Sequence, residues 1–207
     1  VELVGVSKAN SSVDYAMLEY CIREDLKLKK PRMMAVLNPV KLVIDNYPEG
    51  QTEMLDVPNN LENPELGDRK VPFGRELYIE RDDFMEEPPK KYFRMFPGNE
   101  VRLMGAYFVR CTGCEKDADG NVTVVHGTYD PETKSGSGFE GRKVKGTIHW
   151  VNIPTARQVE CRLYENIVDE EKGKLNEDGS LNLNPNSLTV LHECYVEPAL
   201  AEGRALD

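Results

Sequence analysis

Two hydrophobic periods divide the chain. Near its start, apolar residues recur at the spacing of one face of an α-helix. Ser11 or Ser12 can cap such a helix, and Pro31 ends it because proline lacks the amide proton that a helix needs. The sequence therefore predicts a helix from Val13 to about Lys29. Its apolar face would consist of Val13, Met17, Leu18, Cys21, Ile22 and Leu26.

After Pro31 the period becomes that of β-strands, in which alternate residues face opposite sides. Asn38-Pro39 breaks the first run, and the turn sequence at 117–121 (DADGN) joins two later runs as a hairpin. A polar segment at 58–73 is predicted to be a loop. The predicted strands lie within residues 33–45, 48–57, 75–84, 99–116, 121–130, 142–151, 156–168 and 186–197.

The order of these elements points to a fold class. The sequence shows no alternation of strands with helices and no repeat of fixed period, which disfavours a parallel α/β sheet and a solenoid. Many short strands after one helix are typical of β-barrels. The 207 residues suffice for one or two domains with cores of their own. Because Val1 stands where a starting methionine would, we expect a part of a longer protein.

The charge of the chain is unevenly distributed. Its formal net charge is −10, which argues against nonspecific attraction to nucleic acid. Basic residues nevertheless concentrate at 23–41, 89–110 and 141–146, whereas acids collect at 80–87 and 165–178. A surface for RNA could therefore be built from the basic stretches while the acidic stretches face away.

Cysteine usage and hydropathy bear on the cellular location. No apolar run approaches the roughly 20 residues of a membrane helix, and no signal peptide opens the chain. The five cysteines form no secreted-scaffold pattern, and their odd number favours a reducing compartment. We therefore expect a cytoplasmic location.

The sequence predicts neither a catalytic constellation nor a metal site. Cys111 and Cys114 form a single CxxC that no second Cys or His pair completes, and residues at that spacing on a strand face opposite sides. The segment at 117–121 resembles the start of a calcium loop, but its glycine comes too early and no Glu closes the loop. No phosphate-binding glycine motif is present. The histidines, at 126, 149 and 192, are scattered without a nucleophile pairing.

One stretch, 89–110 (PKKYFRMFPGNEVRLMGAYFVR), combines cations with aromatic residues. It carries five basic residues and one acid. Arginine forks can bind phosphates and base edges, and aromatic rings can stack on unpaired bases. The combination suggests a reader of single-stranded RNA, and the alternative is a surface hairpin with solvated charges and core aromatics. The aromatic residues are Tyr92, Phe93, Phe96, Tyr107 and Phe108.

Five segments occur in the order and at the spacing found in a known family. They are IREDL (22–26), PRMMAVLNPVKLVIDNY (31–47), PELGDRKVPF (64–73), EVRL (100–103) and GRKVKGTIHWV (141–151). Together they closely resemble the C-terminal half of the bacterial-type glutaminyl-tRNA synthetases, over nearly the whole chain. Each segment alone would be a weak signal, but five in the same order make a strong one.

The resemblance implies an activity for the parent protein. The family consists of class I aminoacyl-tRNA synthetases, which join glutamine to its tRNA with ATP and Mg. The HIGH-like and KMSKS-like motifs of their catalytic domain are absent from this sequence. The resemblance therefore implies tRNA-Gln as the partner of this region, no cofactor within it, and neither a membrane nor DNA as a partner. Glutamine and ATP would bind elsewhere in the parent enzyme.

The resemblance also implies the architecture, which is mainly β with two β-barrels, proximal and distal, after a short α-helical segment. The double proline at 88–89 and the acidic loop at 169–180 would be the crossings between the barrels. The family's last strands would follow Asp207. The implied division is 1–30 for the end of a helical connecting subdomain, 31–88 with 180–207 for an incomplete proximal anticodon-binding barrel, and 89–179 for the distal one.

In the family the three anticodon bases are unstacked and separately pocketed. By resemblance, Arg32 and Lys91 would lie near the middle base, Arg94 would read the third base, and Arg102 would contact the first. Lys91 stands where relatives have Gln. Met104 stands where they have a second Arg, a departure that would loosen discrimination at the first base. Possible phosphate contacts are Lys90, Lys143 and Lys145.

Other interpretations stay open from the sequence. Each of the four anticodon residues could instead serve the structure, as a partner of helix-end carbonyls, a solvated charge or a member of an ion pair. The region could belong to a related glutamyl-tRNA synthetase, because amino-acid specificity lies in the catalytic half. It could also be a ribosomal-protein-like RNA-binding β-barrel, or a barrel that binds no nucleic acid and whose basic segments do not converge.

Overall fold

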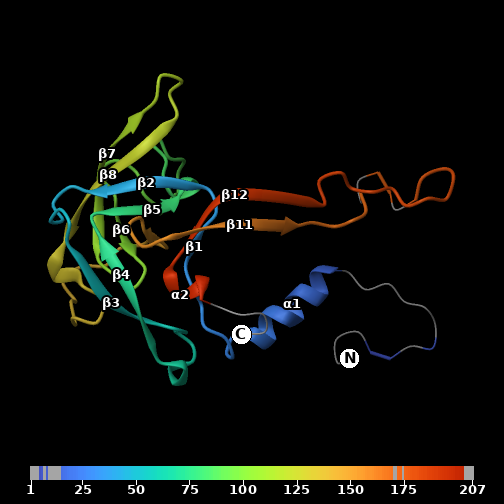
Figure 1. Ribbon diagram of the computed structural model, residues 1–207, viewed down its shortest axis with the longest axis horizontal. Helices are drawn as coiled ribbons and strands as arrows, with labels where there is room; N and C mark the ends of the chain where they lie inside the picture. The colour runs from blue at the N-terminus through green and yellow to red at the C-terminus, as the bar shows by residue number, and fades with distance from the viewer. Residues whose placement is uncertain (1–4, 7, 9–14, 170–171, 174, 203–207) are drawn as a thin grey trace.

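The computed structural model describes residues 5–6, 8, 15–169, 172–173 and 175–202, and it is built mainly from β-strands (Figure 1). A short helix, α1 (Tyr15–Leu26), precedes the strands, and a one-turn helix, α2 (Pro198–Ala201), follows them. The expected fold class, mainly β after a short helical segment, is confirmed. Neither α-helix of the described part is long and apolar enough to cross a membrane.

Helix α1 confirms the predicted helix over most of its length. The predicted start at Val13 lies outside the described residues, and the helix ends at Leu26 rather than near Lys29. There the amide of Lys29 donates to the carbonyl of Leu26, so the chain tightens before Pro31, which cannot extend a helix. No residue of α1 is buried, so its apolar face has no cover from the described part of the chain.

The strands are short, as the alternating pattern predicted. Every predicted strand segment overlaps at least one observed strand. The bounds are β1 Ala35–Val36, β2 Pro39–Ile44, β3 Thr52–Pro58, β4 Asp68–Gly74, β5 Glu76–Glu80, β6 Glu100–Leu103, β7 Phe108–Lys116, β8 Val122–Asp130, β9 Thr147–Ile148, β10 Val151–Asn152, β11 Arg157–Tyr164 and β12 Leu188–Val196. Single 3₁₀ turns lie at Pro64–Leu66, Arg81–Asp83 and Pro131–Thr133.

These strands pair into three sheets among the described residues. The largest has seven strands in the order β10-β5-β2-β8-β7-β6-β9, with β2 parallel to β8 and antiparallel to β5. A second sheet has the order β1-β12-β11, and β3 pairs with β4 alone. The large sheet joins strands from both expected barrels, so the boundary between a proximal and a distal barrel stays a prediction.

Strand β4 shows that the predicted loop at 58–73 was partly wrong. Residues 68–74 pair antiparallel with β3 along its whole length, and Met54 lies opposite Pro72. Proline is tolerated here because β4 has one neighbouring strand in its sheet, so a missing amide donor costs little on the open side. Burial of Val71 and Phe73 stabilises the strand, although its polar flanks resemble a loop.

The predicted strand at 142–151 was too long. Residues 141–146 are irregular, and the rest splits into β9 and β10. Strand β9 pairs with β6, whereas β10 pairs with β5, so the chain changes neighbours at His149 and Trp150. Two different partners cannot share one continuous ladder, which is why the segment breaks.

The predicted hairpin at 117–121 is confirmed between β7 and β8. Asp117 organises the turn, because its Oδ1 accepts from the amides of Asp119 (3.0 Å) and Asn121 (2.8 Å). Gly120 has a φ of 84°, which glycine adopts without strain. The carboxylate of Asp117 is thus satisfied by the backbone, as the interpretation of this segment as a turn requires.

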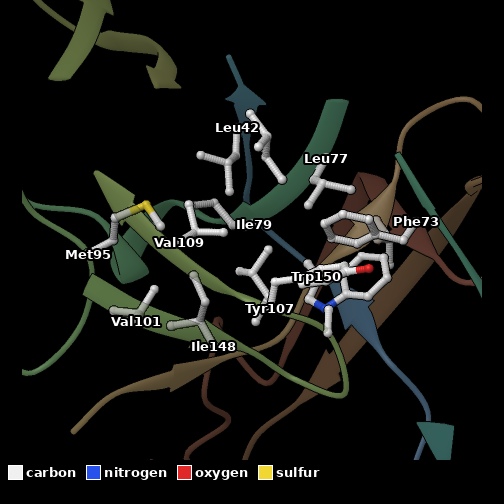
Figure 2. Packing of buried hydrophobic residues seen from close by; sticks show 14 of the residues in the cluster. Leu42, Phe73, Leu77, Ile79, Met95, Val101, Tyr107, Val109, Ile148 and Trp150 are labelled. Atoms are coloured by element: carbon white, nitrogen blue, oxygen red, sulfur yellow. The ribbon is translucent and has the colours of Figure 1, made fainter. Parts of the chain in front are cut away.

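An aromatic core joins the β3–β4 hairpin to the large sheet (Figure 2). The ring of Phe73 lies 5.1 Å from Trp150 and 5.3 Å from Tyr107, measured between centroids. Trp150 is fully buried, and its Nε1 donates to the carbonyl of Met104 (3.0 Å). This bond satisfies the indole in the core and also fixes the backbone beside Arg102.

Strands β11 and β12 form a long arm that projects from the body of the molecule (Figure 1). The described residues 165–169, 172–173 and 175–187 continue the arm, and Tyr164 at the end of β11 is exposed. At its base, β1 pairs with β12, so residues near the start and the end of the chain lie side by side.

Candidate nucleic-acid interface

The first part of the basic stretch 89–110 lies in an irregular segment, residues 85–99, which follows β5 and a 3₁₀ turn. Its anchor is Met95, a fully buried residue whose amide donates to the carbonyl of Asp83 (2.9 Å) and whose carbonyl accepts from the amide of Met85 (3.1 Å). Pro88 and Pro89 keep the intervening chain out of helix and sheet. Met95 therefore fixes the middle of the segment, while the side chains of Lys90, Lys91 and Arg94 reach the surface.

Arg94 lies at the rim of a small polar pocket. Its Nε pairs with Oδ1 of Asp83 at 3.1 Å, and its Nη1 lies 3.5 Å from the carbonyl of Asp82. The side chain of Arg94 is 54% exposed, whereas that of Asp83 is 8% exposed. The guanidinium is thus oriented by a buried carboxylate and still open to solvent. The pocket is lined by Glu80, Asp82, Asp83, Arg94, Thr147, Ile148 and His149.

Charged groups perturb one another across this pocket. Burial raises the pKa of Asp83, and Arg94 opposes this effect. The carboxylate of Glu80, whose Oε1 lies 3.6 Å from Nε2 of His149, raises the pKa of His149. Burial alone would raise the pKa of Glu80, but His149 and the amides of the β1–β2 turn outweigh burial, and the pKa falls. Those amides belong to Leu37 (2.7 Å) and Asn38 (3.0 Å).

Lys90 and Lys91 are exposed, and neither ammonium has a hydrogen-bond or ion-pair partner among the residues that the structure describes. Lys91 has a φ of 72°, the only positive φ of a non-glycine residue in the described part. Such backbone costs an L-residue roughly 1–2 kcal/mol. Strain of this kind is typical of positions held for function, so it motivates a role for Lys91.

Arg102 on β6 is held by a ring and a hydroxyl. Its guanidinium carbon lies 4.2 Å from the ring centroid of Phe108, and its Nη1 donates to Oγ of Ser135 (2.9 Å). Burial lowers the pKa of Arg102 from its ordinary value, although the group stays cationic. In the β6–β9 pairing Arg102 lies opposite Thr147, which also lines the pocket of Arg94. Thr147 of β9 is therefore a neighbour of Arg102 in the sheet and of Arg94 in the pocket lining.

Arg32 lies in a different environment. Its Nη2 donates to Oε1 of Glu62 (2.7 Å) and lies 3.5 Å from the carbonyl of Lys27, just past α1. The hydrogen bond from Arg32 is the largest cause that lowers the pKa of Glu62. These contacts support a structural role at the helix end, and a common site for Arg32 with the other three residues stays a prediction.

Arg142 is a cation of this surface that the sequence did not single out. It donates through Nε and Nη2 to both carboxylate oxygens of Glu100 (2.7 Å each), and Nη2 also reaches Asp130 (2.8 Å). Its guanidinium lies 5.3 Å from the ring of Phe108, on whose ring Arg102 also packs. Arg142 is thus occupied by two carboxylates, and no local sequence pattern announces partners so far apart in the chain.

The other predicted residues differ in their exposure and in the contacts that their side chains make. Lys143 is exposed and its ammonium has no partner in the described part of the chain. Lys145 places its ammonium 5.2 Å from the ring of Phe93. Met104 is 38% exposed while its backbone is bonded to Trp150 and Ile148. No group of three or more His, Cys, Asp or Glu that could hold a metal ion lies within the described residues.

Two segments of the chain match models of known protein families, and both models describe the same kind of domain. Residues 30–130 and 147–207 each match the anticodon-binding domain of class I tRNA synthetases (E and Q). The chain is 55% identical to the glutamine–tRNA ligase of Clostridium perfringens over 99% of its length, and 58% identical to that of Clostridioides difficile over 94%. It is 50% identical to the same enzyme of Bradyrhizobium diazoefficiens over its whole length.

The chain spans only 35–37% of the length of these relatives and matches their C-terminal region. The matches agree with the β-rich fold and with the basic, partly aromatic surface described above. The chain belongs to the family of anticodon-binding domains of the class I (E and Q) tRNA synthetases.

Proposed function

We propose that this chain is the anticodon-reading region of a glutamine–tRNA ligase, whose partner is tRNA-Gln. The observation that carries the proposal is that Thr147 of β9 lines the pocket of Arg94 and also pairs with Arg102 in the β6–β9 ladder. Lys90 and Lys91 add two exposed ammonium groups that have no partner in the described part of the chain. Cations of this density attract phosphate, and arginine forks can read the edges of unpaired bases. The names of the relatives favour glutamine over glutamate as the amino acid.

The geometry leaves both arginines able to bind a ligand. An arginine carries five N–H donors. The contacts of Arg94 occupy Nε and Nη1, and the described hydrogen bonds of Arg102 use Nη1 alone. Each guanidinium is therefore oriented by the protein and retains donors for a base, which favours recognition at low entropic cost.

The assignments to single bases are part of the proposal. Arg94 would read the third anticodon base in its pocket, and Arg102 would contact the first. Lys91 would lie near the middle base, with Arg32 as a further candidate there. Lys90, Lys143 and Lys145 would contact phosphates. Support comes from the orientation of Arg94 by Asp83 and from the strained backbone of Lys91.

The parent protein would supply the catalytic reaction. It would join glutamine to tRNA-Gln with ATP and Mg, in a part of the protein that this chain does not include. The uncovered apolar face of α1 supports this view, because such a face normally packs on another element. Reading an anticodon also fits the expected cytoplasmic location.

The proposed division into barrels has partial support. Pairing of β1 with β12 brings residues 35–36 and 195–196 together, as expected if a proximal barrel uses chain from before and after a distal one. We therefore keep 31–88 with 180–207 as the proximal barrel and 89–179 as the distal barrel within the proposal.

The experiment that tests the function is a binding comparison. The chain is titrated with a tRNA-Gln transcript and with transcripts that differ from it at one anticodon base. We expect each change at the middle or third base to weaken binding by about 5- to 150-fold, the range of a lost bidentate contact. Equal affinity for all transcripts would contradict anticodon reading and favour a nonspecific RNA-binding barrel.

A further inference from the structure

The aromatic residues of the stretch 89–110 differ sharply in exposure. Tyr107 and Phe108 are 5% and 2% exposed, and both belong to the protein interior. Tyr92 and Phe96 are half-buried and contact each other at 6.4 Å between centroids. Phe93 is 47% exposed. Of the five rings that composition offered for base stacking, Phe93 is therefore the one whose surface is open to a ligand.

The backbone that carries Phe93 is tightly held. A Cβ built on Gly146 would lie 1.8 Å from the carbonyl oxygen of Phe93, so only glycine allows this approach. The carbonyl of Gly146 accepts in turn from the amide of Arg102 (2.9 Å). On the preceding residue, the hydroxyl of Tyr92 donates to the carbonyl of Asp82 (3.0 Å). An exposed ring on such a backbone is preorganised, which lowers the entropic cost of binding.

A cation accompanies the ring. The ammonium of Lys145 lies 5.2 Å from the centroid of Phe93, within the range of a cation–π contact. Arg94 follows directly in sequence and faces the neighbouring pocket. A hydrophobic ring with the ammonium of Lys145 beside it suits a ligand that is flat on one side and anionic on another, which is the chemistry of a nucleotide.

We propose that Phe93 is a stacking platform for one unpaired nucleobase of the bound tRNA, and that Lys145 contacts the phosphate of the same nucleotide. This inference rests on the proposed function, since it takes tRNA as the ligand. It adds a contact of a different kind: Arg94 and Arg102 discriminate between bases by hydrogen bonds, whereas a ring accepts any base face.

The test uses the tRNA-Gln transcript and a set of transcripts that each lack one base of the anticodon loop. Stacking of a base on an aromatic side chain corresponds to about 5- to 150-fold in affinity. We expect Phe93→Ala to weaken binding of the intact transcript by that factor. One abasic transcript should show the same loss with the wild type and little further loss with Phe93→Ala.

Three further variants separate stacking from folding. Phe93→Trp retains a π-face and should bind like the wild type. Phe93→Leu retains apolar bulk, so it should unfold at the temperature of the wild type and still bind as weakly as Phe93→Ala. Tyr164→Ala removes an even more exposed ring, on the arm, and should bind normally.

Failure of this inference is distinguishable from failure of the proposed function. If Phe93→Leu binds every transcript like the wild type, or if its loss adds to that of every abasic transcript, Phe93 is not a stacking platform. If the wild type fails to discriminate among anticodons while the Phe93 effects persist, the assignment to the anticodon is wrong. Phe93 would then stack on another base of the loop. If the wild type binds no tRNA, both proposals fall.

Discussion

The side chain of Arg94 contacts a buried carboxylate on one side and faces an open pocket on the other. Asp83 holds it from the protein side, and the open pocket faces it from the other. The ion pair with Asp83 fixes the orientation of the planar guanidinium but uses only some of its N–H donors. The remaining donors therefore point in a defined direction. Lys143 offers the contrast of an exposed cation without a partner in the described part of the chain. The two residues should therefore differ in specificity, although each contributes one positive charge.

Replacing Arg94 by Ala should weaken binding of cognate tRNA-Gln by about 5- to 150-fold. A transcript changed at the third anticodon base should lose little further, because the contact is already gone. Lys143→Ala should weaken both transcripts equally and reduce the salt slope by about one. The measurement is a binding matrix at two salt concentrations. Equal losses for both transcripts with Arg94→Ala would show that Arg94 reads no base.

Lys91 allows strain and binding to be separated. Lys91→Gly should raise the free energy of unfolding by about 0.5–1 kcal/mol, because relief of the left-handed backbone exceeds the entropy of an added glycine. Lys91→Ala keeps the strain and should give no such gain. Both variants lose the ammonium and should bind tRNA more weakly. Chemical denaturation and tRNA titration measure the two effects, and unchanged tRNA affinity in both variants would exclude Lys91 from the interface.

At the scale of elements, a buried ion pair joins β4 to the end of β12. Arg69 donates through Nε and Nη2 to Oε1 (2.7 Å) and Oε2 (3.2 Å) of Glu197. The two side chains are 9% and 1% exposed. By contrast, the neighbouring pair of Lys70 and Asp56 is mostly exposed. The same strand thus carries one ion pair inside the protein and one in solvent.

Removal of the buried pair's cation should be costly. Arg69→Met leaves Glu197 buried without its partner, and we expect a loss of about 3–5 kcal/mol in the free energy of unfolding. Lys70→Met, one residue along, should change it by no more than about 1 kcal/mol. Urea denaturation of both variants gives the comparison. Similar small effects would mean that Glu197 finds another partner or escapes to solvent.

At the scale of the whole molecule, Glu53 connects β3 to side chains from three other segments, which follow β2, β6 and β8. Its Oε1 accepts from the hydroxyls of Tyr107 (2.7 Å) and Tyr47 (3.2 Å), and its Oε2 pairs with Lys134 (2.8 Å). Burial would raise the pKa of Glu53, but the bonds from Lys134 and the tyrosines outweigh burial and lower it. The ionised carboxylate is therefore the form that the fold stabilises.

A lowered pKa in the folded state fixes the direction of the pH dependence. The contribution of Glu53 to stability is present above the ordinary pKa of a glutamate, about 4.3, and is lost as the pH falls through the lower folded pKa. Glu53→Gln should thus be less stable than the wild type by about 1 kcal/mol at pH 7. The difference should shrink towards pH 3. Thermal unfolding across this range checks it, and a constant difference would assign the effect to packing alone.

The whole molecule also sets a limit on activity. Because the sequence carries no nucleotide-binding motif, the pure chain should show no glutamine-dependent exchange between ATP and pyrophosphate. It should still bind tRNA, with an affinity that falls steeply as salt rises, since phosphate contacts release counterions. Any exchange above that of a buffer control would contradict the placement of the catalytic part outside this chain.

Local chemistry determined much of the fold from the sequence alone. The period of α1, the stop at Pro31 and the hairpin turn organised by Asp117 depend on residues close in sequence, so their patterns were sufficient. The order of the five family segments likewise identified the family without any structure. The cations Lys90, Lys91, Arg94 and Arg102 were identified as candidates in the same way.

Contacts between distant segments decided the rest. Strand β4 exists because β3 pairs with it and the core buries Phe73, which its polar flanks do not reveal. Residues 142–151 break because β9 and β10 have different partners. Phe93 and Phe108 stand in the same aromatic, basic stretch, yet one is exposed and the other buried. Burial depends on what packs against a residue in three dimensions, and only the tertiary structure supplies those neighbours.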